Sequence, residues 1–196
     1  MLYLMRHGQT EWNKQFRIQG MSNIPLNDAG IEMAREAAER YADVNIDICY
    51  SSPLIRAYDT ACIFMEGRGI PVITDERLSE MDFGKYDGTG GGELYPGHPV
   101  HTFLYDPAHY EPEEDGESFE ELYARIADFL NDKVRPELLS GKDVLIVGHG
   151  SVNLCIKTIL EKRPLSEFWT GVMHNCEITA FAGDILSEPA NGHIIY

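Results

Sequence analysis

Leu2-Tyr3-Leu4-Met5-Arg6-His7-Gly8-Gln9-Thr10-Glu11-Trp12-Asn13 is an apolar run that stops abruptly at a cation, an imidazole and a glycine. The run at its start is short and rich in residues that strands accept, which predicts a buried strand. Open α/β sheets place their ligand crevice at the carboxyl ends of their strands. We therefore expect Arg6 and His7 at the mouth of a crevice, where Gly8 lets a ligand or another backbone come close.

A second apolar run of the same kind lies far along the chain. Val144-Leu145-Ile146-Val147 stops at Gly148-His149-Gly150. Each run thus delivers a histidine at the end of a predicted strand, and the carboxyl ends of parallel strands share one edge of a sheet. The sequence predicts that these two histidines belong to the same crevice.

The composition is that of one ordinary globular domain. The chain has 196 residues, and 43% of them are hydrophobic, which suits a single domain over residues 1–196. Lys and Arg total 16 against 32 Asp and Glu, so the net charge is −16. An acidic surface disfavours nucleic acid and anionic membranes as partners. A small anionic substrate remains compatible with this charge if cations such as Arg6 and Arg56 are concentrated in one pocket.

The cysteines and the N-terminus indicate a cellular compartment. Four widely spaced cysteines include no Cys-x-x-Cys pair, which predicts a reduced protein without a disulfide framework. No signal-peptide pattern opens the chain, and no apolar stretch approaches the length of a membrane span. We expect a cytoplasmic protein without a membrane partner. A homodimer is left open.

The patterns between the two motifs predict strands that alternate with helices. Helices are expected over residues 29–41, from Ser52-Pro53 onward, over 100–105, from Ser118 to a break at Pro136, and over 151–160; strands are expected over 46–50, 70–74, 176–181 and 193–196. Such alternation predicts a three-layer α/β/α fold, in which a mostly parallel sheet is covered on both faces.

Residues 84–120 are the least regular part of the chain. They are rich in Gly, Pro, Tyr and acidic side chains, and they are too few and too polar to bury a core of their own. We expect them to cross the active site as a lid that sets substrate specificity. Four aromatic residues are candidates for an apolar wall there, although packing onto the domain explains most of them: Tyr86, Tyr95, Phe103 and Tyr105.

Four segments together resemble the signature of the histidine phosphatase superfamily, also called the phosphoglycerate mutase-like family. They are residues 6–13, 51–61, 78–84 and 147–150. Arg-His-Gly alone is a weak signal, whereas four segments in the family's order are a specific one that covers nearly the whole chain. The resemblance implies the phosphoglycerate mutase-like fold, with one antiparallel strand near an edge of the sheet. The chain departs from the family at Tyr86-Asp87-Gly88, where an aromatic-Glu-Gly sequence is common.

Cleavage of a phosphomonoester requires a particular set of side chains. The transferred group is anionic, so the site must supply fixed positive charge and hydrogen-bond donors. A neutral imidazole can attack phosphorus, and a carboxylic acid can protonate the leaving oxygen. This sequence offers Arg6, Arg56, His7, His149 and Glu80 for these tasks. Because nearby cations lower the pKa of an imidazole, we expect His7 to be neutral and nucleophilic at neutral pH.

The resemblance assigns a role to each residue. His7 matches the nucleophile that becomes phosphohistidine, and Glu80 matches the proton donor to the leaving group, later the base for the attacking water. The residues that hold the phosphoryl group are matched by Arg6, Arg56 and His149. Further positions match a phosphate contact, Asn13, and expected pocket-lining residues, Gln19, Gly20 and the backbone of Gly150.

The same resemblance implies no cofactor and no metal. A loose histidine cluster, His98, His101 and His109, has no fitting set of cysteine or carboxylate ligands beside it, so no metal site is predicted. Taken singly, each of the site residues is better explained as a structural or solvated side chain. Only their joint order favours the functional interpretation.

Three functions follow from this sequence. The leading one is a metal-independent phosphatase for small-molecule phosphomonoesters, similar to α-ribazole phosphatases or of broad specificity. The first alternative is a cofactor-dependent phosphoglycerate mutase, which the absence of a large insertion and a long tail disfavours. The second is a non-catalytic phospholigand-binding protein, which has no need of a proton donor such as Glu80. The sequence does not identify the physiological substrate.

Overall fold

A five-stranded sheet runs through the computed structural model, which describes residues 1–90, 95–113 and 115–192. The strand order is β3-β2-β4-β1-β5. The strands are β1 (Leu2–Arg6), β2 (Ile48–Ser51), β3 (Val72–Thr74), β4 (Val144–Gly148) and β5 (Ile178–Phe181). Neighbours are parallel except for β5, which pairs antiparallel with β1. This confirms the predicted mostly parallel sheet with one antiparallel edge strand.

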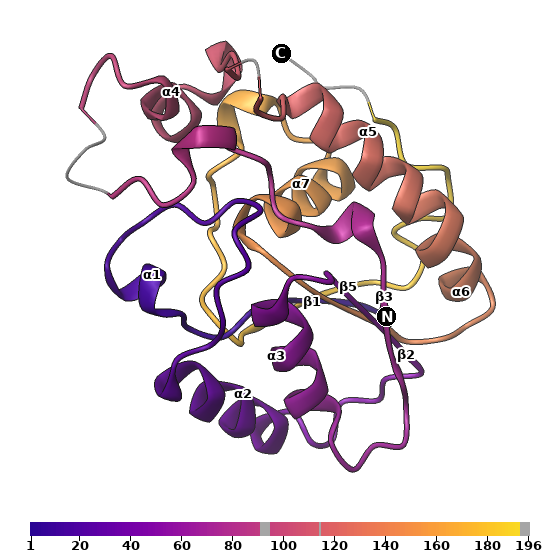
Figure 1. Ribbon diagram of the computed structural model, residues 1–196. Coiled ribbons are helices and arrows are strands. Elements are labelled where there is room, and N and C mark those ends of the chain that lie inside the picture. Colours follow the sequence, from indigo (N-terminus) through magenta and orange to yellow (C-terminus); the bar gives the residue numbers. More distant parts are fainter. Residues whose placement is uncertain (91–94, 114, 193–196) are drawn as a thin grey trace.

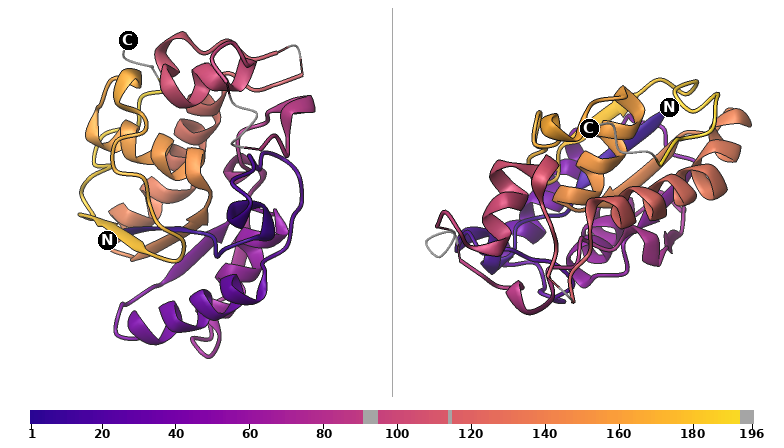
Figure 2. Two further views of the ribbon diagram at one scale, coloured as in Figure 1. Left: turned by 90° about the vertical axis from the view of Figure 1, so that its left-hand side faces the viewer. Right: turned by 90° about the horizontal axis from the view of Figure 1, so that it is seen from above.

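Helices cover both faces of this sheet (Figure 1). One face carries α2 (Asp28–Arg40) and α3 (Ile55–Met65), and the opposite face carries α5 (Phe119–Phe129) and α7 (Gly150–Glu161). Figure 2 shows the sheet between these two pairs, as the three-layer prediction requires. Shorter helices are α1 (Glu11–Lys14), α4 (Pro99–Tyr105) and α6 (Arg135–Leu139). In the described part of the chain, no helix is long and apolar enough to cross a membrane.

The two central strands are buried on both faces because their side chains alternate between two cores. Leu4 and Ile146 pack in the cluster formed with α5 and α7. Met5 and Val147 pack in the cluster formed with α2 and α3. Every residue of β4 is buried. The strand ends that carry the two histidines are therefore fixed by packing from above and below.

Two of the predicted helix starts have different outcomes. The helix predicted from Ser118 is α5, and its start is fixed by a capping box between Ser118 and Glu121. The start predicted at Ser52-Pro53 is wrong, because α3 begins at Ile55. The Ser52 N–H continues the sheet ladder by donating to the carbonyl of Val147 at 3.2 Å. The chain then bends at Pro53 and Leu54 before α3 starts.

Two further predictions concern the second half of the chain. The break expected at Pro136 lies earlier in the chain, because α6 runs through Pro136 and the regular helix is interrupted by a π-helical turn at Leu130–Val134. The strand predicted over residues 176–181 is β5. The strand predicted over 193–196 lies outside the described residues.

The segment predicted as a lid is attached to the main core. The expected helix at 100–105 is α4, and its Val100 and Phe103 are buried in the cluster formed with α5 and α7. The Phe103 ring lies 4.7 Å from that of Phe83 and 5.0 Å from that of Trp169, in edge-to-face arrangements. Aromatic packing thus fixes α4 beside the sheet edge where β1 ends.

Candidate active site

The carboxyl ends of β1 and β4 bring His7 and His149 together. The His7 N–H donates to the carbonyl of Gly148 at 3.0 Å, which extends the ladder between the strands by one residue. The two imidazole rings lie 5.2 Å apart between centroids, at 60° to each other. Both are buried, with 3% and 0% of their surfaces exposed.

One ring nitrogen of His7 is committed to the backbone. Nδ1 lies 2.7 Å from the carbonyl oxygen of Gly8. Because a carbonyl only accepts hydrogen bonds, Nδ1 carries the hydrogen, and the lone pair of the neutral ring is on Nε2. The Gly8 N–H in turn donates to Thr60 Oγ1 at 2.9 Å. This chain of contacts fixes the tautomer that an attack through Nε2 requires.

Gly8 is required by a close contact between two backbones. A Cβ on Gly8 would lie 2.5 Å from the carbonyl oxygen of Gly30, in the first turn of α2, and a Cβ on Gly30 would lie 2.0 Å from the carbonyl oxygen of Gln9. The close approach predicted at Gly8 is thus to another backbone. It presses the loop after β1 against α2 and fixes the direction in which the chain leaves His7.

Arg56 is fully buried in the first turn of α3, where the sequence places it. Its Nη1 donates to the carbonyl of Ser22 at 2.7 Å and its Nη2 to that of Gly20 at 2.9 Å. The Asp87 carboxylate holds this loop, since it accepts from the N–H of Gly20 at 3.1 Å and from that of Ser22 at 2.7 Å. The burial of Arg56 lowers its pKa to about 10, so the guanidinium is charged at neutral pH.

Four buried nitrogen atoms of this region have no hydrogen-bond partner among the described residues. They are Nε of Arg6, Nε of Arg56, and both ring nitrogens of His149. Buried polar groups are normally paired, because an unpaired donor loses its hydration without compensation. Nitrogen atoms of two arginines and of a second imidazole therefore remain available near His7 to bind a ligand. Charged nitrogen donors of this kind suit the anionic oxygens of a phosphoryl group.

The electrostatics of the site keep both imidazoles neutral. Burial, and then the charges of Arg56 and Arg6, hold the pKa of His7 well below its ordinary value of 6.5. Burial, and then Arg56 and His7, lower the pKa of His149 in the same way. These directions agree with the prediction of a neutral His7 at neutral pH.

Glu80 lies beside the start of α7 with 7% of its surface exposed. Its Oε1 accepts from the N–H of Met81 at 2.9 Å, and its Oε2 accepts from the N–H of Ser151 at 3.1 Å. The second contact ties the carboxyl group to the helix that follows His149. The two segments that the sequence placed in one site, 78–84 and 147–150, are thereby joined at Glu80.

A cavity of about 210 Å³ is lined by Arg6, His7 and Glu80, whereas Arg56 and His149 are not part of its described wall. Six predicted site residues line it, namely Arg6, His7, Asn13, Gln19, Glu80 and Gly150. Its apolar lining was not predicted apart from Phe103: Ile18, Phe83, Phe103, Leu104, Trp169 and Val172. Arg17 and Ser151 complete the lining. Of the predicted pocket residues, Gly20 contacts Arg56 from behind and is not part of the described wall.

Two polar residues of the cavity wall, Asn13 and Gln19, are held by Thr10 in the loop after β1. Asn13 Oδ1 accepts from the N–H of Thr10 at 3.1 Å, which closes the capping box of α1. Gln19 Oε1 accepts from Thr10 Oγ1 at 2.8 Å. Thr10 thus orients both amides, and it carries no signal of its own in the sequence.

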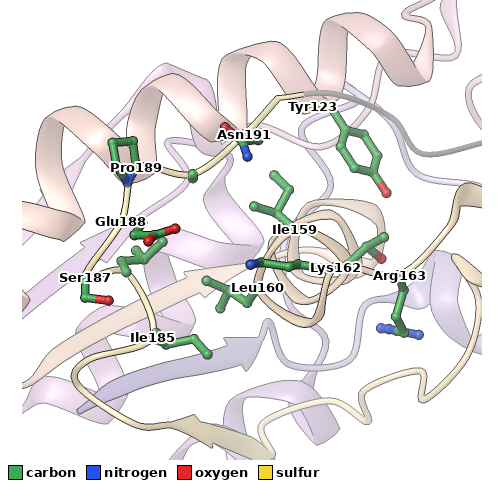
Figure 3. A pocket seen from close by; sticks show the side chains of 13 residues that line it. Tyr123, Ile159, Leu160, Lys162, Arg163, Ile185, Ser187, Glu188, Pro189 and Asn191 are labelled. Carbon is green, nitrogen blue, oxygen red and sulfur yellow. The ribbon is translucent and has the colours of Figure 1, made fainter.

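A second and larger cavity of about 430 Å³ contains none of the predicted site residues. Figure 3 shows it between the end of α7 and residues 185–191, with Tyr123 of α5 on one side. Its charged residues, Lys162, Arg163 and Glu188, are of both signs. Cavity size therefore does not locate the candidate site, whereas the clustering of unpaired buried nitrogens does.

The three histidines of the 84–120 segment have contacts of their own. His98 Nδ1 accepts from the N–H of Val100 at 3.2 Å and caps α4. His101 stacks on Tyr105, and His109 pairs with Asp106. Among residues 1–90, 95–113 and 115–192, no group of three or more His, Cys, Asp or Glu side chains is arranged to hold a metal ion.

Acid is expected to destabilise the fold through the two buried imidazoles. Their pKa values are lowered in the folded state, so below about pH 6.5 the unfolded chain binds more protons than the folded one. Above the unfolded pKa the two neutral imidazoles do not lower the free energy of unfolding. Below it, the free energy of unfolding decreases as the pH falls, by up to about 1.4 kcal/mol per pH unit for each imidazole. Urea unfolding at about pH 7 and about pH 5.5 measures this slope. His149→Asn should roughly halve it; an unchanged slope in that variant would contradict the assignment.

Comparison with known proteins places the chain in a family. The model of the histidine phosphatase superfamily (branch 1) matches residues 2–184. A putative phosphoserine phosphatase 2 of Hydrogenobacter thermophilus is 34% identical over 180 residues, covering 91% of this chain and 87% of that protein. A 2,3-bisphosphoglycerate-dependent phosphoglycerate mutase of a Methylobacterium species is 32% identical over 185 residues, covering 88% of each chain.

Solved structures agree with these relatives. YhfR of Bacillus stearothermophilus superposes with a TM-score of 0.83 at 32% identity, over 90% of this chain and 88% of that one. The α-ribazole phosphatase of Shigella flexneri superposes with a TM-score of 0.77 at 27% identity, over 90% and 87% of the two chains. The match of sequence, fold and site order leads to one conclusion: this chain belongs to the histidine phosphatase superfamily.

Proposed function

We propose that this protein is a metal-independent phosphomonoesterase that hydrolyses small-molecule phosphates through a phosphohistidine on His7. The observation that carries this proposal is the cluster of unpaired buried nitrogens of Arg6, Arg56 and His149 around a neutral imidazole. These donors suit the anionic oxygens of a phosphoryl group, in a setting where burial strengthens each interaction. The net charge of −16 supports a small substrate rather than a nucleic acid.

The proposed reaction has two steps. In the first, Nε2 of His7 attacks phosphorus, the bond from phosphorus to the leaving oxygen breaks, and the carboxylic acid of Glu80 donates its proton to that oxygen. The Nδ1–H of His7 keeps its bond to the Gly8 carbonyl and stabilises the charged phosphoimidazole. In the second, the Glu80 carboxylate takes a proton from water, the water oxygen bonds to phosphorus, and the nitrogen–phosphorus bond breaks.

The test is phosphate release from a panel of phosphomonoesters in the presence of a chelator. The panel holds p-nitrophenyl phosphate, a sugar phosphate, phosphoserine, α-ribazole phosphate and 3-phosphoglycerate. Chelator-resistant release is the expected result. Binding of these esters without any turnover would instead assign a phospholigand-binding protein.

A phosphoglycerate mutase is the second candidate, which the similarity to the Methylobacterium mutase favours. A mutase returns the phosphoryl group to a substrate hydroxyl instead of water. Conversion of 3-phosphoglycerate into its isomer, dependent on bisphosphoglycerate and without release of phosphate, would select it.

For the substrate we propose a broad range of esters with an apolar or ring-bearing leaving group. The wall formed by Phe83, Phe103 and Trp169 supports this range, because the leaving group lies next to Glu80 in the same cavity. The structural similarity to the Shigella α-ribazole phosphatase agrees with it. Within the panel, the esters that carry an aromatic ring, p-nitrophenyl phosphate and α-ribazole phosphate, are expected to have lower KM values than the sugar phosphate.

Arg17 is expected to favour leaving groups that carry a carboxylate. Arg17 lines the cavity and is not one of the cations proposed to bind the phosphoryl group. Two contacts hold its guanidinium group. Its Nε donates to the Gly88 carbonyl at 2.6 Å, and the group lies 4.6 Å from the centre of the Trp12 ring. Arg17→Gln should raise the KM for phosphoserine about 10-fold, in line with the loss of a charged hydrogen bond. Phosphoethanolamine lacks only the carboxylate and is the matched control. Equal changes for both esters would contradict this role.

We also infer that the protein works in a reducing compartment such as the cytoplasm. All four cysteines are free, and Cys49, Cys155 and Cys176 are buried. Disulfide bonds are typical of oxidising compartments, whereas buried thiols persist where thiols are kept reduced. Labelling of four thiols per unfolded chain, from protein purified without reductant, is the expected result.

A further inference from the structure

The segment that carries Glu80 is held from outside the cavity by one arginine of α5. Arg125 Nη1 donates to the carbonyl of Ser79 at 2.8 Å and to that of Arg77 at 2.5 Å. The turn at Glu76–Leu78 lies beside α5 (Figure 1). The backbone immediately before Glu80 is therefore attached to a helix that packs on the main core.

A carboxylate orients this arginine and holds the backbone after Glu80 as well. Glu117 accepts from Arg125 through both oxygens, Oε1 from Nε at 2.5 Å and Oε2 from Nη2 at 2.8 Å. Its Oε2 also accepts from the N–H of Asp82 at 3.3 Å, and its own N–H donates to the Asp82 carbonyl at 2.8 Å. The two side chains are largely buried, with 20% and 14% of their surfaces exposed. Together they hold both sides of Glu80.

Two hydrogen bonds hold the Glu80 carboxyl group itself, from the N–H groups of Met81 and Ser151. Among the described residues, Arg125 and Glu117 supply the side-chain hydrogen bonds that reach the backbone on either side of Glu80 from another element. Ser79 is buried, but its Oγ has no hydrogen-bond partner, so the Ser79 carbonyl is its attachment to α5. Leu78 and Met81 are fully buried and anchor the segment on its other side by packing alone. Apolar packing tolerates small rotations, whereas forked hydrogen bonds fix direction.

We propose that Arg125, oriented by Glu117, is a positioning residue that sets where the Glu80 carboxyl group lies against the leaving oxygen. The inference rests on the proposed function of Glu80 as proton donor. A general acid must lie within hydrogen-bond reach of the atom it protonates, and an error of about 1 Å in placement can cost about 100-fold in rate. Arg125 is not part of the described wall of the cavity that contains His7. It lies with Glu80, Ser79 and Glu117 in the wall of a neighbouring cavity, and its hydrogen bonds to this segment are to the carbonyls of Arg77 and Ser79, through which it acts.

The test uses leaving groups that differ in their need for a proton. p-Nitrophenolate leaves as a stable anion, whereas an alkoxide must be protonated as it departs. Arg125→Met is therefore expected to lower kcat/KM about 10- to 100-fold for the alkyl phosphate of the panel that the wild-type protein hydrolyses fastest. For p-nitrophenyl phosphate, kcat/KM should change by less than about 3-fold. Its kcat and KM should fall together, because Glu80 also serves as base in the second step.

Two further variants separate position from charge. Arg125→Lys keeps the positive charge but loses the forked contacts, so it should resemble Arg125→Met. Arg77→Met is the matched control: Arg77 comes shortly before Glu80, and among the described residues its side chain pairs with the carboxylates of Asp75, Asp128 and Asp132 rather than with the backbone around Glu80. It should lower stability without any dependence on the leaving group. Full activity in Arg125→Lys would overturn the proposal in favour of a charge effect.

The remaining outcomes are equally distinct. Equal losses for both esters in Arg125→Met, or no loss for either, would overturn the positioning role. Retained turnover of p-nitrophenyl phosphate shows that a variant is folded, and Glu117→Gln serves as the second variant if Arg125→Met does not fold. Absence of phosphate release by the wild-type protein would contradict the proposed function itself, which is measured before any variant is compared.

Discussion

His7→Ala is expected to abolish phosphate release, with a loss on the order of 10⁴-fold or more in kcat. The variant removes Nε2 of His7, the atom that bonds to phosphorus in the proposed mechanism. The other ring nitrogen, Nδ1, is held by the carbonyl of Gly8. His149 lies in the same site, but its place beside the two arginines suits binding of the phosphoryl oxygens. Steady-state phosphate release with p-nitrophenyl phosphate measures the effect.

A matched control separates chemistry from folding. His109→Ala removes an imidazole whose side chain is 80% exposed and paired with Asp106, and its kinetics should equal those of the wild-type protein. The His7→Ala protein should still bind inorganic phosphate through Arg6 and Arg56 in a calorimetric titration. Residual turnover within about 10-fold of wild type would exclude His7 as the nucleophile.

Glu80→Gln is expected to lower kcat/KM for alkyl phosphates about 10²- to 10⁴-fold, the range of a lost general acid. The amide is close in size to the carboxyl group but cannot transfer a proton. Its oxygen can accept from only one of the two N–H groups, of Met81 and Ser151, that the carboxylate binds. For p-nitrophenyl phosphate kcat/KM should fall far less, because that leaving group needs no proton.

The control for this variant is Glu76→Gln, which removes an exposed carboxylate from the same segment. Its kinetics should be unchanged for both esters. Unchanged turnover of alkyl phosphates in Glu80→Gln would exclude Glu80 as the proton donor. Binding of inorganic phosphate to the Glu80→Gln protein shows in either case that the phosphoryl site is intact.

Local signals in the sequence predicted most of the fold. The apolar runs that stop at His7 and at His149 are strand ends in the structure. The capping box at Ser118 begins α5 because both of its hydrogen bonds lie within four consecutive residues. The start of α3 was missed because Ser52 donates to Val147, and a residue so distant in sequence leaves no local pattern.

The same distinction explains which site residues were found. The predicted catalytic residues each lie within a sequence motif. Arg6, His7 and Glu80 line one cavity in the structure. His149 lies beside His7 outside the described wall of that cavity, and the charge of buried Arg56 acts on both imidazoles.

The supporting residues were missed because they act across long separations. Asp87 reaches back to the N–H of Gly20, and Arg125 to the carbonyl of Ser79. The sequence showed that Asp87 departs from the family pattern at Tyr86-Asp87-Gly88, but it did not show that Asp87 binds the N–H of Gly20. In the sequence, a charged residue on a helix or in a loop is indistinguishable from a solvent-exposed one, even when its side chain binds the backbone of a distant segment.

The most direct test of the account is to trap the phosphorylated protein. Wild-type protein is mixed with p-nitrophenyl phosphate, quenched with denaturant at alkaline pH, and digested for mass spectrometry. One phosphoryl group is expected on the peptide that contains His7; it should be stable in base, labile in acid and absent from His7→Ala. A phosphoryl group on another residue, or rapid turnover by Glu80→Gln without any phosphorylated peptide, would contradict a mechanism through phosphohistidine at His7.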